Sequence, residues 1–205
     1  MTVEAFHIRP YREEDNASVY EVCLRTGDGG NDATHLYDDP RALGNIYAGP
    51  YVTMEPELAF VLEDNQGVCG YVLGAPDSKS FFRAYEREWL PVLRGRHPEP
   101  TGDPANWSQT QKVYHEYYHP EIHVPEPHDL YPSHVHIDLL PRAQGRGMGA
   151  KMMEAELSAL IKLGSPGVHL GVAVSNHRAD RFYRKLGFHE LIRVKDSLYL
   201  ARKLP

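Results

Sequence analysis

Three alternating glycines, Gly145, Gly147 and Gly149, constrain the fold of this chain more than any other feature of its sequence. They follow an apolar run at 135–140 and open a segment, 147–163, whose apolar residues recur at helical spacing. The pattern predicts a strand, a tight turn and the start of a helix. The first turn of a helix has unpaired backbone N–H groups and a partial positive charge, and glycine lets a ligand approach the backbone. The segment therefore predicts a site for an anion such as a pyrophosphate.

The glycines match neither of two other phosphate-binding motifs. The segment lacks the Lys-Ser/Thr pair of a P-loop, and its G-x-G-x-G spacing differs from the G-x-G-x-x-G of a dinucleotide fingerprint. Taken alone, the cluster is also compatible with a tight turn that binds nothing.

Apolar runs and helical patterns alternate along the rest of the chain. Strands are expected at 6–9, 58–63, 68–74, 135–140, 168–174, 191–194 and 198–201, and helices at 13–25, 40–47, 81–93, 109–118, 147–163 and 177–186. This order predicts one α/β domain over 1–205, with a central mixed sheet flanked by helices and parallel pairing at its centre. The segment 76–132 is rich in proline, aromatic and histidine residues and is expected to be a large insertion packed on the core.

Composition narrows the classes of partner. The 205 residues carry a net charge of −6, which argues against a nucleic-acid binder because phosphate neutralisation needs a basic face. No apolar stretch approaches the roughly 20 residues of a membrane span, and the first residues have no apolar leader, so a cytoplasmic location is expected. Cys23 and Cys69 form no CxxC pair and predict neither a redox nor a metal motif.

Two motifs make the chain resemble the GCN5-related N-acetyltransferase (GNAT) superfamily. The acetyl-CoA motif of that family, Gln/Arg-x-x-Gly-x-Gly/Ala, is met by Gln144, Gly147 and Gly149, and a second family pattern runs from Asn176 through Phe-Tyr183 to Gly-Phe188. Both lie in the last third of the chain, and the earlier elements agree with the family only in their order. The resemblance implies the GNAT fold, acetyl-CoA as acetyl donor, and direct transfer to a primary amine.

The resemblance also implies residue roles. The strands 135–140 and 168–174 are expected to splay apart and admit the pantetheine arm of the cofactor. Cofactor contacts are expected at Ile137, Leu139, Leu140, Gln144, Gly145, Arg146, Gly147, Met148, Gly149, Asn176 and Tyr183. Tyr183 matches the family tyrosine that protonates the departing CoA thiolate, and its alternative role is a core tyrosine on the apolar face of its helix.

The catalytic base stays open at this point. Asp138, on the cofactor strand, is the leading candidate, and His134, His136 and His169 are the others. Strand alternation puts Asp138 on the face opposite Ile137, so a structural, hydrogen-bonded carboxylate is an equal alternative. A water chain with no dedicated base is a further alternative.

The acceptor is also open. Asp28, Asp32 and Asp38 could hold a cationic amine, although a solvated acidic loop explains them equally well. The insertion 76–132 is expected near the acceptor site, and the residues proposed to line it are Tyr114, Tyr117 and Tyr118. Pairing of the C-terminal strands between subunits is a route to a homodimer.

A narrower resemblance rests on the segments 24–34 and 131–141, which look like bacterial proteins akin to the acetyltransferase-like C-terminal domain of O-GlcNAc hydrolases. Some GNAT-like domains bind acetyl-CoA weakly or lack activity. A catalytically weak acetyl-CoA sensor or interaction domain is therefore the main alternative, although the phosphate-binding glycines present here favour cofactor binding.

A remote alternative comes from His115-Glu116-x-x-His119, which satisfies the H-E-x-x-H template of zinc hydrolases with Glu116 as base. Pro120 ends the helix directly after the second histidine, and Pro125 occupies the position of a third ligand. No metal is therefore expected in the active site.

Overall fold

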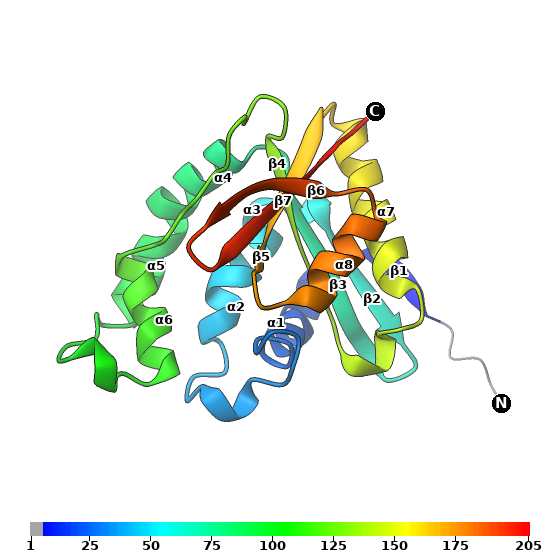
Figure 1. Ribbon diagram of the computed structural model, residues 1–205. Coiled ribbons are helices and arrows are strands. Elements are labelled where there is room, and N and C mark those ends of the chain that lie inside the picture. Colours follow the sequence, from blue (N-terminus) through cyan, green and yellow to red (C-terminus); the bar gives the residue numbers. More distant parts are fainter. Residues whose placement is uncertain (1–5) are drawn as a thin grey trace.

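Seven strands form one mixed sheet in the computed structural model, which describes residues 6–205 (Figure 1). The strands are β1 (His7–Pro10), β2 (Ala59–Asp64), β3 (Gly67–Ala75), β4 (Ser133–Leu139), β5 (Gly167–Ala173), β6 (His189–Val194) and β7 (Ser197–Lys203). Their order is β1-β2-β3-β4-β5-β7-β6, and every neighbouring pair is antiparallel except the central pair β4–β5. The expected α/β class and the parallel centre are confirmed.

Helices cover both faces of this sheet. On one face lie α1 (Asn16–Leu24), α2 (Ala42–Tyr47) and α3 (Gly49–Met54), and α7 (Met148–Lys162) packs on the other. The side chains of β3 show the division: Tyr71 interacts with Cys23 of α1, whereas a Cβ at Gly74 would meet Glu156 of α7. The last helix is α8 (His177–Lys185). No helix within residues 6–205 is long and apolar enough to cross a membrane.

The expected insertion contains α4 (Ser78–Ala84), α5 (Leu90–Arg96) and α6 (Gln109–Tyr118). The helix expected over 81–93 is confirmed, but a π-helical turn at Tyr85–Trp89, which was not expected, joins α4 to α5. Pro91 explains this turn: it lacks an N–H and its ring clashes with the carbonyl one turn earlier, so the regular α-helical bonding cannot continue through it. Helix α6 packs on α2 through Tyr117, which is fully buried.

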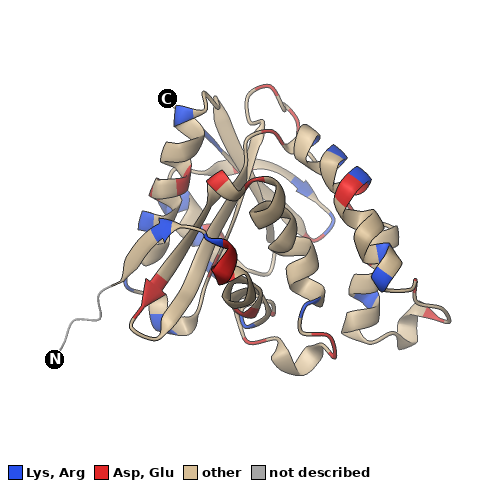
Figure 2. Cartoon of the chain, turned by 180° about the vertical axis from the view of Figure 1, so that it is seen from behind, with Lys and Arg blue, Asp and Glu red and all other residues tan. Residues whose placement is uncertain are grey.

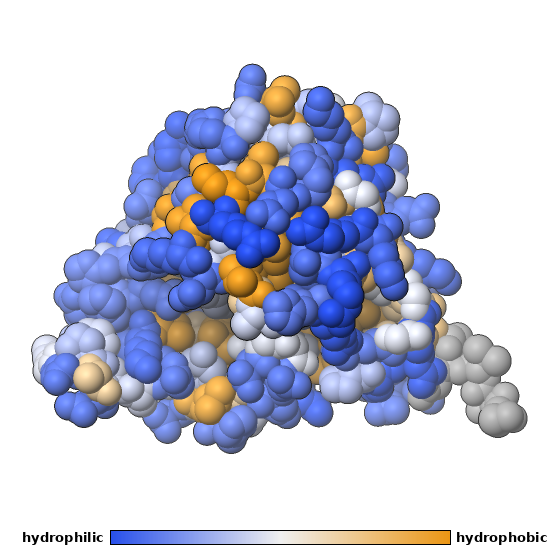
Figure 3. All heavy atoms as spheres, viewed as in Figure 1, coloured by the Kyte–Doolittle hydropathy of each residue, from blue (hydrophilic) through white to orange (hydrophobic). Residues whose placement is uncertain are grey.

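Charged residues of both signs are spread over the helical side of the molecule seen in Figure 2. On the opposite side, apolar residues reach the surface over the C-terminal strands (Figure 3). Ile192 of the edge strand β6 is 42% exposed. Pairing of this edge between two copies stays a prediction.

Glu156 is a charged residue of α7 whose side chain points into the core. The residue is fully buried, and neither carboxyl oxygen has a hydrogen-bond partner. Burial raises the pKa of Glu156 to about 8, because the ionised form would lose its hydration without compensation. The folded protein therefore holds this carboxyl protonated at neutral pH.

Glu156 should make the protein less stable as pH rises from about 4.5 to about 8, because the unfolded chain loses this proton and the folded chain keeps it. Replacement by glutamine, Glu156→Gln, removes that loss. The variant should gain about 4 kcal/mol relative to wild type between pH 5 and pH 8.5. Urea unfolding at both pH values measures this difference. Glu154→Gln, at an exposed position on the same helix, serves as the control; an equal pH response in both variants would contradict the assignment.

Candidate functional site

The central strands β4 and β5 pair over only two positions. Ser133 pairs with Val168 and His134 with His169, and no pairing follows beyond them. Both strands nevertheless continue, because β4 stays paired with β3 up to Leu139 and β5 stays paired with β7. The middle of the sheet therefore opens into a gap, and residues 136–139 are only half-buried. The splay expected between these strands is present.

The glycine segment lies where the chain leaves β4 and enters α7. Gly145 and Gly147 both have positive φ values, 72° and 76°, which side chains other than glycine rarely adopt. A Cβ at either position would meet no atom within 4 Å, so this backbone faces open space. No side chain caps the start of α7, and its first N–H groups are free to bind an anion.

Gly149 is constrained differently, by packing. A Cβ there would lie 3.1 Å from the ring of Phe182 on α8. Met148, the first residue of α7, is buried rather than turned toward the open side. These two residues shape the helix start, and only their backbone groups are suited to a ligand.

Polar side chains surround the helix start. Gln144 donates from Nε2 to the carbonyl of Leu139 at 2.7 Å and accepts from Arg178 at 2.6 Å, which ties the end of β4 to α8. Arg146 lies over the ring of Phe6, 5.5 Å from its centre. Arg178 was not predicted as a site residue. Its position two residues after Asn176 was the available signal, but the sequence does not show that it reaches Gln144.

Asn176 and Tyr183 both belong to α8. The Oδ1 of Asn176 accepts the N–H of Ala179 at 3.0 Å and so caps the helix. Tyr183 is buried, and its pKa is raised, first by burial and then by the negative charge of Asp138. The phenol therefore stays protonated at neutral pH and is available as a proton donor.

Asp138 forms a hydrogen-bonded cluster on the α1 face of the sheet. Tyr71, its partner across the β3–β4 ladder, donates to Oδ2 at 2.7 Å. The Nε2 of His136 lies 3.1 Å from the same oxygen and 3.2 Å from the Tyr71 hydroxyl. The predicted face of Asp138 is confirmed, and its side chain keeps 22% exposure. Tyr71 was missed because its role depends on the register between two strands.

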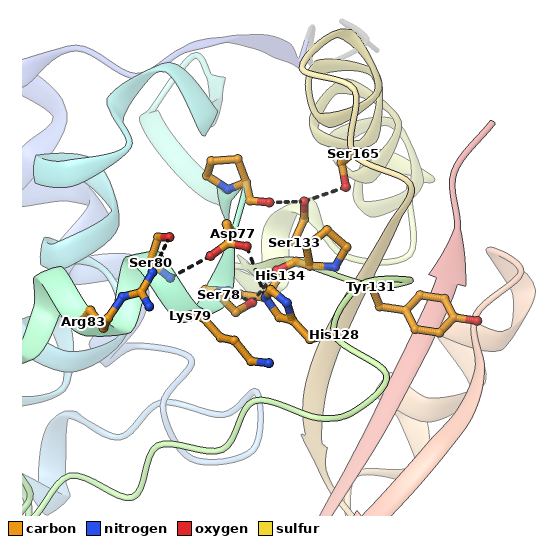
Figure 4. A network of polar contacts seen from close by, with 12 residues as sticks. Asp77, Ser78, Lys79, Ser80, Arg83, His128, Tyr131, Ser133, His134 and Ser165 are labelled. Carbon is orange, nitrogen blue, oxygen red and sulfur yellow. Dashed lines mark hydrogen bonds and ion pairs between the residues drawn. The ribbon is translucent and has the colours of Figure 1, made fainter.

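His134 is part of a buried network at the closed end of the gap (Figure 4), and the buried His169 lies next to it, with Nε2 3.5 Å from the hydroxyl of Ser78. The hydroxyl of Ser78 contacts Nδ1 of His134 at 2.8 Å, and the other His134 nitrogen lies 2.9 Å from the Tyr51 hydroxyl. His169 Nδ1 donates to the carbonyl of Tyr131. Burial lowers the pKa of both imidazoles, for His169 to about 4. These two candidates for the base have structural roles instead.

A recess of about 160 Å³ opens between α2, α3, α4 and α6. Its walls include five aromatic residues and one largely buried carboxylate: Tyr47, Tyr51, Phe81, Phe82, Tyr85 and Glu116. The ring of Tyr47 lies 6.0 Å from that of His136, so the recess borders the Asp138 cluster. Tyr47, on the wall of the recess, is 42% exposed, so the recess is open to solvent at this side.

The expected acceptor-site tyrosines are elsewhere. Tyr117 is buried against α2, Tyr114 donates to Asp39, and Tyr118 donates to the carbonyls of Arg94 and His97. None of the three lines the recess, and their role at an acceptor site stays a prediction. Helix α6 turns these three side chains toward its neighbours and presents Glu116 to the recess instead.

The acidic loop residues are exposed. Asp28, Asp32 and Asp38 all lie at the surface. Hydrogen bonds from Thr34 lower the pKa of Asp32, whose carboxylate is already engaged. None of the three lines the recess, and the solvated-loop interpretation agrees with their positions.

The two histidines of the H-E-x-x-H pattern lie side by side at the end of α6, His115 in its last turn and His119 directly after it, with ring centres 4.4 Å apart. Their neighbour is Glu99, whose Oε1 lies 2.6 Å from Nε2 of His119. Glu116 lies among the aromatic rings of the recess, where burial raises its pKa. The zinc-hydrolase alternative needs Glu116 as base beside the two imidazoles, and this arrangement does not supply it.

Known proteins share this arrangement. The model of the Acetyltransferase (GNAT) family matches residues 103–188, which include β4, the glycine segment and α8. The crystal structure of SsHAT is similar with a TM-score of 0.89 and 42% identity, covering 97% of this chain and 98% of that one. This chain belongs to the GNAT acetyltransferase family.

Two further relatives place the chain within this family. Protein O-GlcNAcase of Rattus norvegicus is 30% identical over 208 residues, which confirms the narrower resemblance. The match covers 99% of this chain, which spans about a fifth (22%) of that relative's length. The structure of yncA from Salmonella typhimurium, solved with acetyl-CoA, shares the fold at 15% identity, with a TM-score of 0.56 and coverage of 98% and 95%. The GNAT family and fold together support an acetyltransferase.

Proposed function

We propose that this GNAT protein transfers an acetyl group from acetyl-CoA directly to the primary amine of a cationic acceptor. The observation that carries the proposal is the gap between β4 and β5, which leads to the uncapped glycine start of α7. The gap leaves one backbone edge of β4 unpaired near Ile137 and Leu139, and an extended pantetheine arm can bond to such an edge as a strand does.

The diphosphate of the cofactor is assigned to the backbone N–H groups from Gln144 to Gly149. Left-handed glycines and an uncapped helix start present these donors to open space, where the helix dipole favours negative charge. Arg146 and Arg178 add positive charge nearby. Asn176, on the other side of the gap, has its Oδ1 engaged in capping α8 and can offer Nδ2 to the cofactor.

The burial of both cysteine thiols favours direct attack of the amine on acetyl-CoA over an acetyl-enzyme intermediate. An acetyl-enzyme would need an accessible thiolate, but Cys23 and Cys69 are both buried, and burial raises the pKa of Cys23 to about 12. In direct transfer the amine nitrogen bonds to the acetyl carbon, the C–S bond breaks, and CoA leaves as a thiolate. Tyr183 is assigned the proton that this thiolate takes up, because its phenol stays protonated.

The Asp138–His136 pair is assigned the role of the base that takes the proton from the attacking amine. His136 is half-exposed and lies between Asp138 and Tyr47, so it connects the gap to the recess. The hydrogen bond from Tyr71 fixes the carboxylate of Asp138, and that carboxylate in turn orients the imidazole. The acid Tyr183 comes from α8, and the base pair comes from the α1 face of β4.

The recess suggests which amine binds. Within the described chain, Glu116 has neither an ion pair nor a hydrogen bond, although it is largely buried among aromatic rings. A carboxylate in such a place is stabilised by a cation, and aromatic faces also attract alkylammonium groups. We assign the recess to a positive group of the acceptor, with the reacting amine of the same molecule extending toward His136. An aliphatic diamine or polyamine has this chemistry.

Gly147→Glu should abolish acetyl-CoA binding, because the new carboxylate repels the diphosphate and its side chain enters the space left by the glycine. Isothermal titration with acetyl-CoA measures the loss. Gly164→Glu is a matched control: Gly164 has a φ of 79°, ends the same helix and also faces open space, so its backbone strain is comparable. Retained affinity in a folded Gly147→Glu protein would contradict the cofactor assignment.

Tyr183→Phe should lower kcat by about 100-fold or more and leave the KM for acetyl-CoA nearly unchanged, because the variant loses only the proton donor. Release of CoA thiol with a panel of amines provides the assay. Tyr131→Phe removes another buried hydroxyl, bonded to His189, and should keep full turnover. Undiminished kcat for Tyr183→Phe would show a core tyrosine. Tight cofactor binding by wild type with no turnover on any amine would favour the sensor alternative.

Glu116→Gln should raise the KM for 1,4-diaminobutane by about 10-fold or more, because one charge-assisted contact is lost. The KM for butylamine, which has no second ammonium group, should change little. Glu86→Gln, at an exposed position of the same insertion, controls for the change in net charge. Equal effects of Glu116→Gln on the two amines would exclude Glu116 as the partner of the distal cation.

A further inference from the structure

Three metal-ligating side chains converge on the outer side of the insertion, away from the acetyl-CoA gap. His115 lies in the last turn of α6, His119 is the residue directly after the helix, and Glu99 comes from the loop between α5 and α6. One ligand atom from each lies within 4.8 Å of the other two. The carboxylate Oε1 of Glu99 is 2.6 Å from Nε2 of His119 and 3.9 Å from Nδ1 of His115.

The shorter of these distances is that of a hydrogen bond between His119 and Glu99, and the pair of distances is also compatible with a tetrahedral ion. Zinc binds histidine nitrogen and carboxylate oxygen at about 2.0–2.2 Å, so neighbouring ligand atoms in a tetrahedral site lie roughly 3.3 Å apart. The two distances from Glu99, 2.6 Å and 3.9 Å, lie on either side of that spacing. Small side-chain rotations therefore suffice to bring the three atoms around one ion.

The environment of His115 adds a second argument. Its Nδ1 is shielded from solvent and has no hydrogen-bond partner. Its ring lies between Trp107, with ring centres 5.0 Å apart, and His119. A buried polar atom without a partner is costly, and a metal ion at the cluster would satisfy it.

We propose that Glu99, His115 and His119 bind a zinc ion that joins the loop 97–108 to α6. Two imidazoles select a transition metal over magnesium or calcium, which prefer oxygen ligands. Water completes the tetrahedron. Glu116 lies in the recess and takes no part, so the site stabilises the structure and does not hydrolyse a substrate.

The role of such an ion follows from the bonds of the loop. Two of its other side-chain bonds are local, since Trp107 donates to the carbonyl of Thr101 and Asp103 accepts from Ala105, and Tyr118 of α6 reaches the loop only at its first residue, the carbonyl of His97. The Glu99–His119 contact crosses from the loop to the helix, and zinc replaces that single proton-dependent bond with three metal–ligand bonds. The proposal is independent of acetyl transfer.

Zinc titration of the chelator-treated protein, followed by calorimetry, tests the proposal. Wild type should bind one zinc ion per chain, and zinc should raise its Tm. His119→Ala and Glu99→Gln should each weaken binding by about 100-fold or more, since loss of even an outer-shell partner costs 10- to 100-fold. His7→Ala, which removes an exposed histidine on β1, should bind zinc as wild type does.

Two results would overturn the site. One is the absence of stoichiometric zinc binding by folded wild-type protein. The other is binding that His119→Ala and Glu99→Gln leave unchanged, which would place the ion elsewhere. Acetyl-CoA affinity, measured on the same samples, should be equal in all variants and shows that each has folded.

Discussion

The limited pairing of β4 and β5 is the constraint on which the rest of the site depends. At its closed end the two paired histidines, His134 and His169, are buried, and Ser78 lies between them. Both imidazoles are kept neutral by burial, so below pH 6.5 the unfolded chain binds more protons than the folded one. The stability that they contribute is therefore lost as pH falls from about 6.5 toward 4. The buried histidine pair holds β4 and β5 together at this end, and the two strands diverge beyond it.

Because β4 and β5 diverge, side chains from the two faces of the sheet can meet at the gap. Tyr183 lies on α8, whereas Asp138 points to the α1 face, and a continuous sheet would separate the two. Burial and, after it, the charge of Asp138 raise the pKa of Tyr183, so the two groups interact where the sheet is open. The proposed acid and the proposed base can thus reach one thioester from opposite faces, and the carboxylate helps keep the phenol protonated.

Local signals predicted much of this fold. Glycine spacing marked the start of α7, and alternation placed Asp138 on the correct face, because both depend on residues close in sequence. The gap was expected from the family resemblance and is present, and the cofactor contacts expected from the same resemblance stay predictions. Helix α3 and the π-helical turn were missed, since short elements next to proline have weak periodicity. Tyr71 was missed as well, because its contact with Asp138 is set by strand register, which the sequence shows only when the pairing is known.

The insertion shows most clearly why its side-chain roles could not be read from sequence. The sequence pattern His115-Glu116-x-x-His119 suggests one zinc centre. In the fold, however, the two histidines and Glu116 lie in two different environments. The two imidazoles meet Glu99, which comes from sixteen positions before His115 in the chain, while Glu116 meets the rings of α2 and α4. Helix α6 therefore carries a candidate metal cluster on one side and a carboxylate of the recess on another. The Glu99 loop and the recess both contact this one helix, so ordering the loop would also restrict the position of Glu116. The proposed metal site on the outer side is thereby linked to the proposed acceptor contact on the inner side.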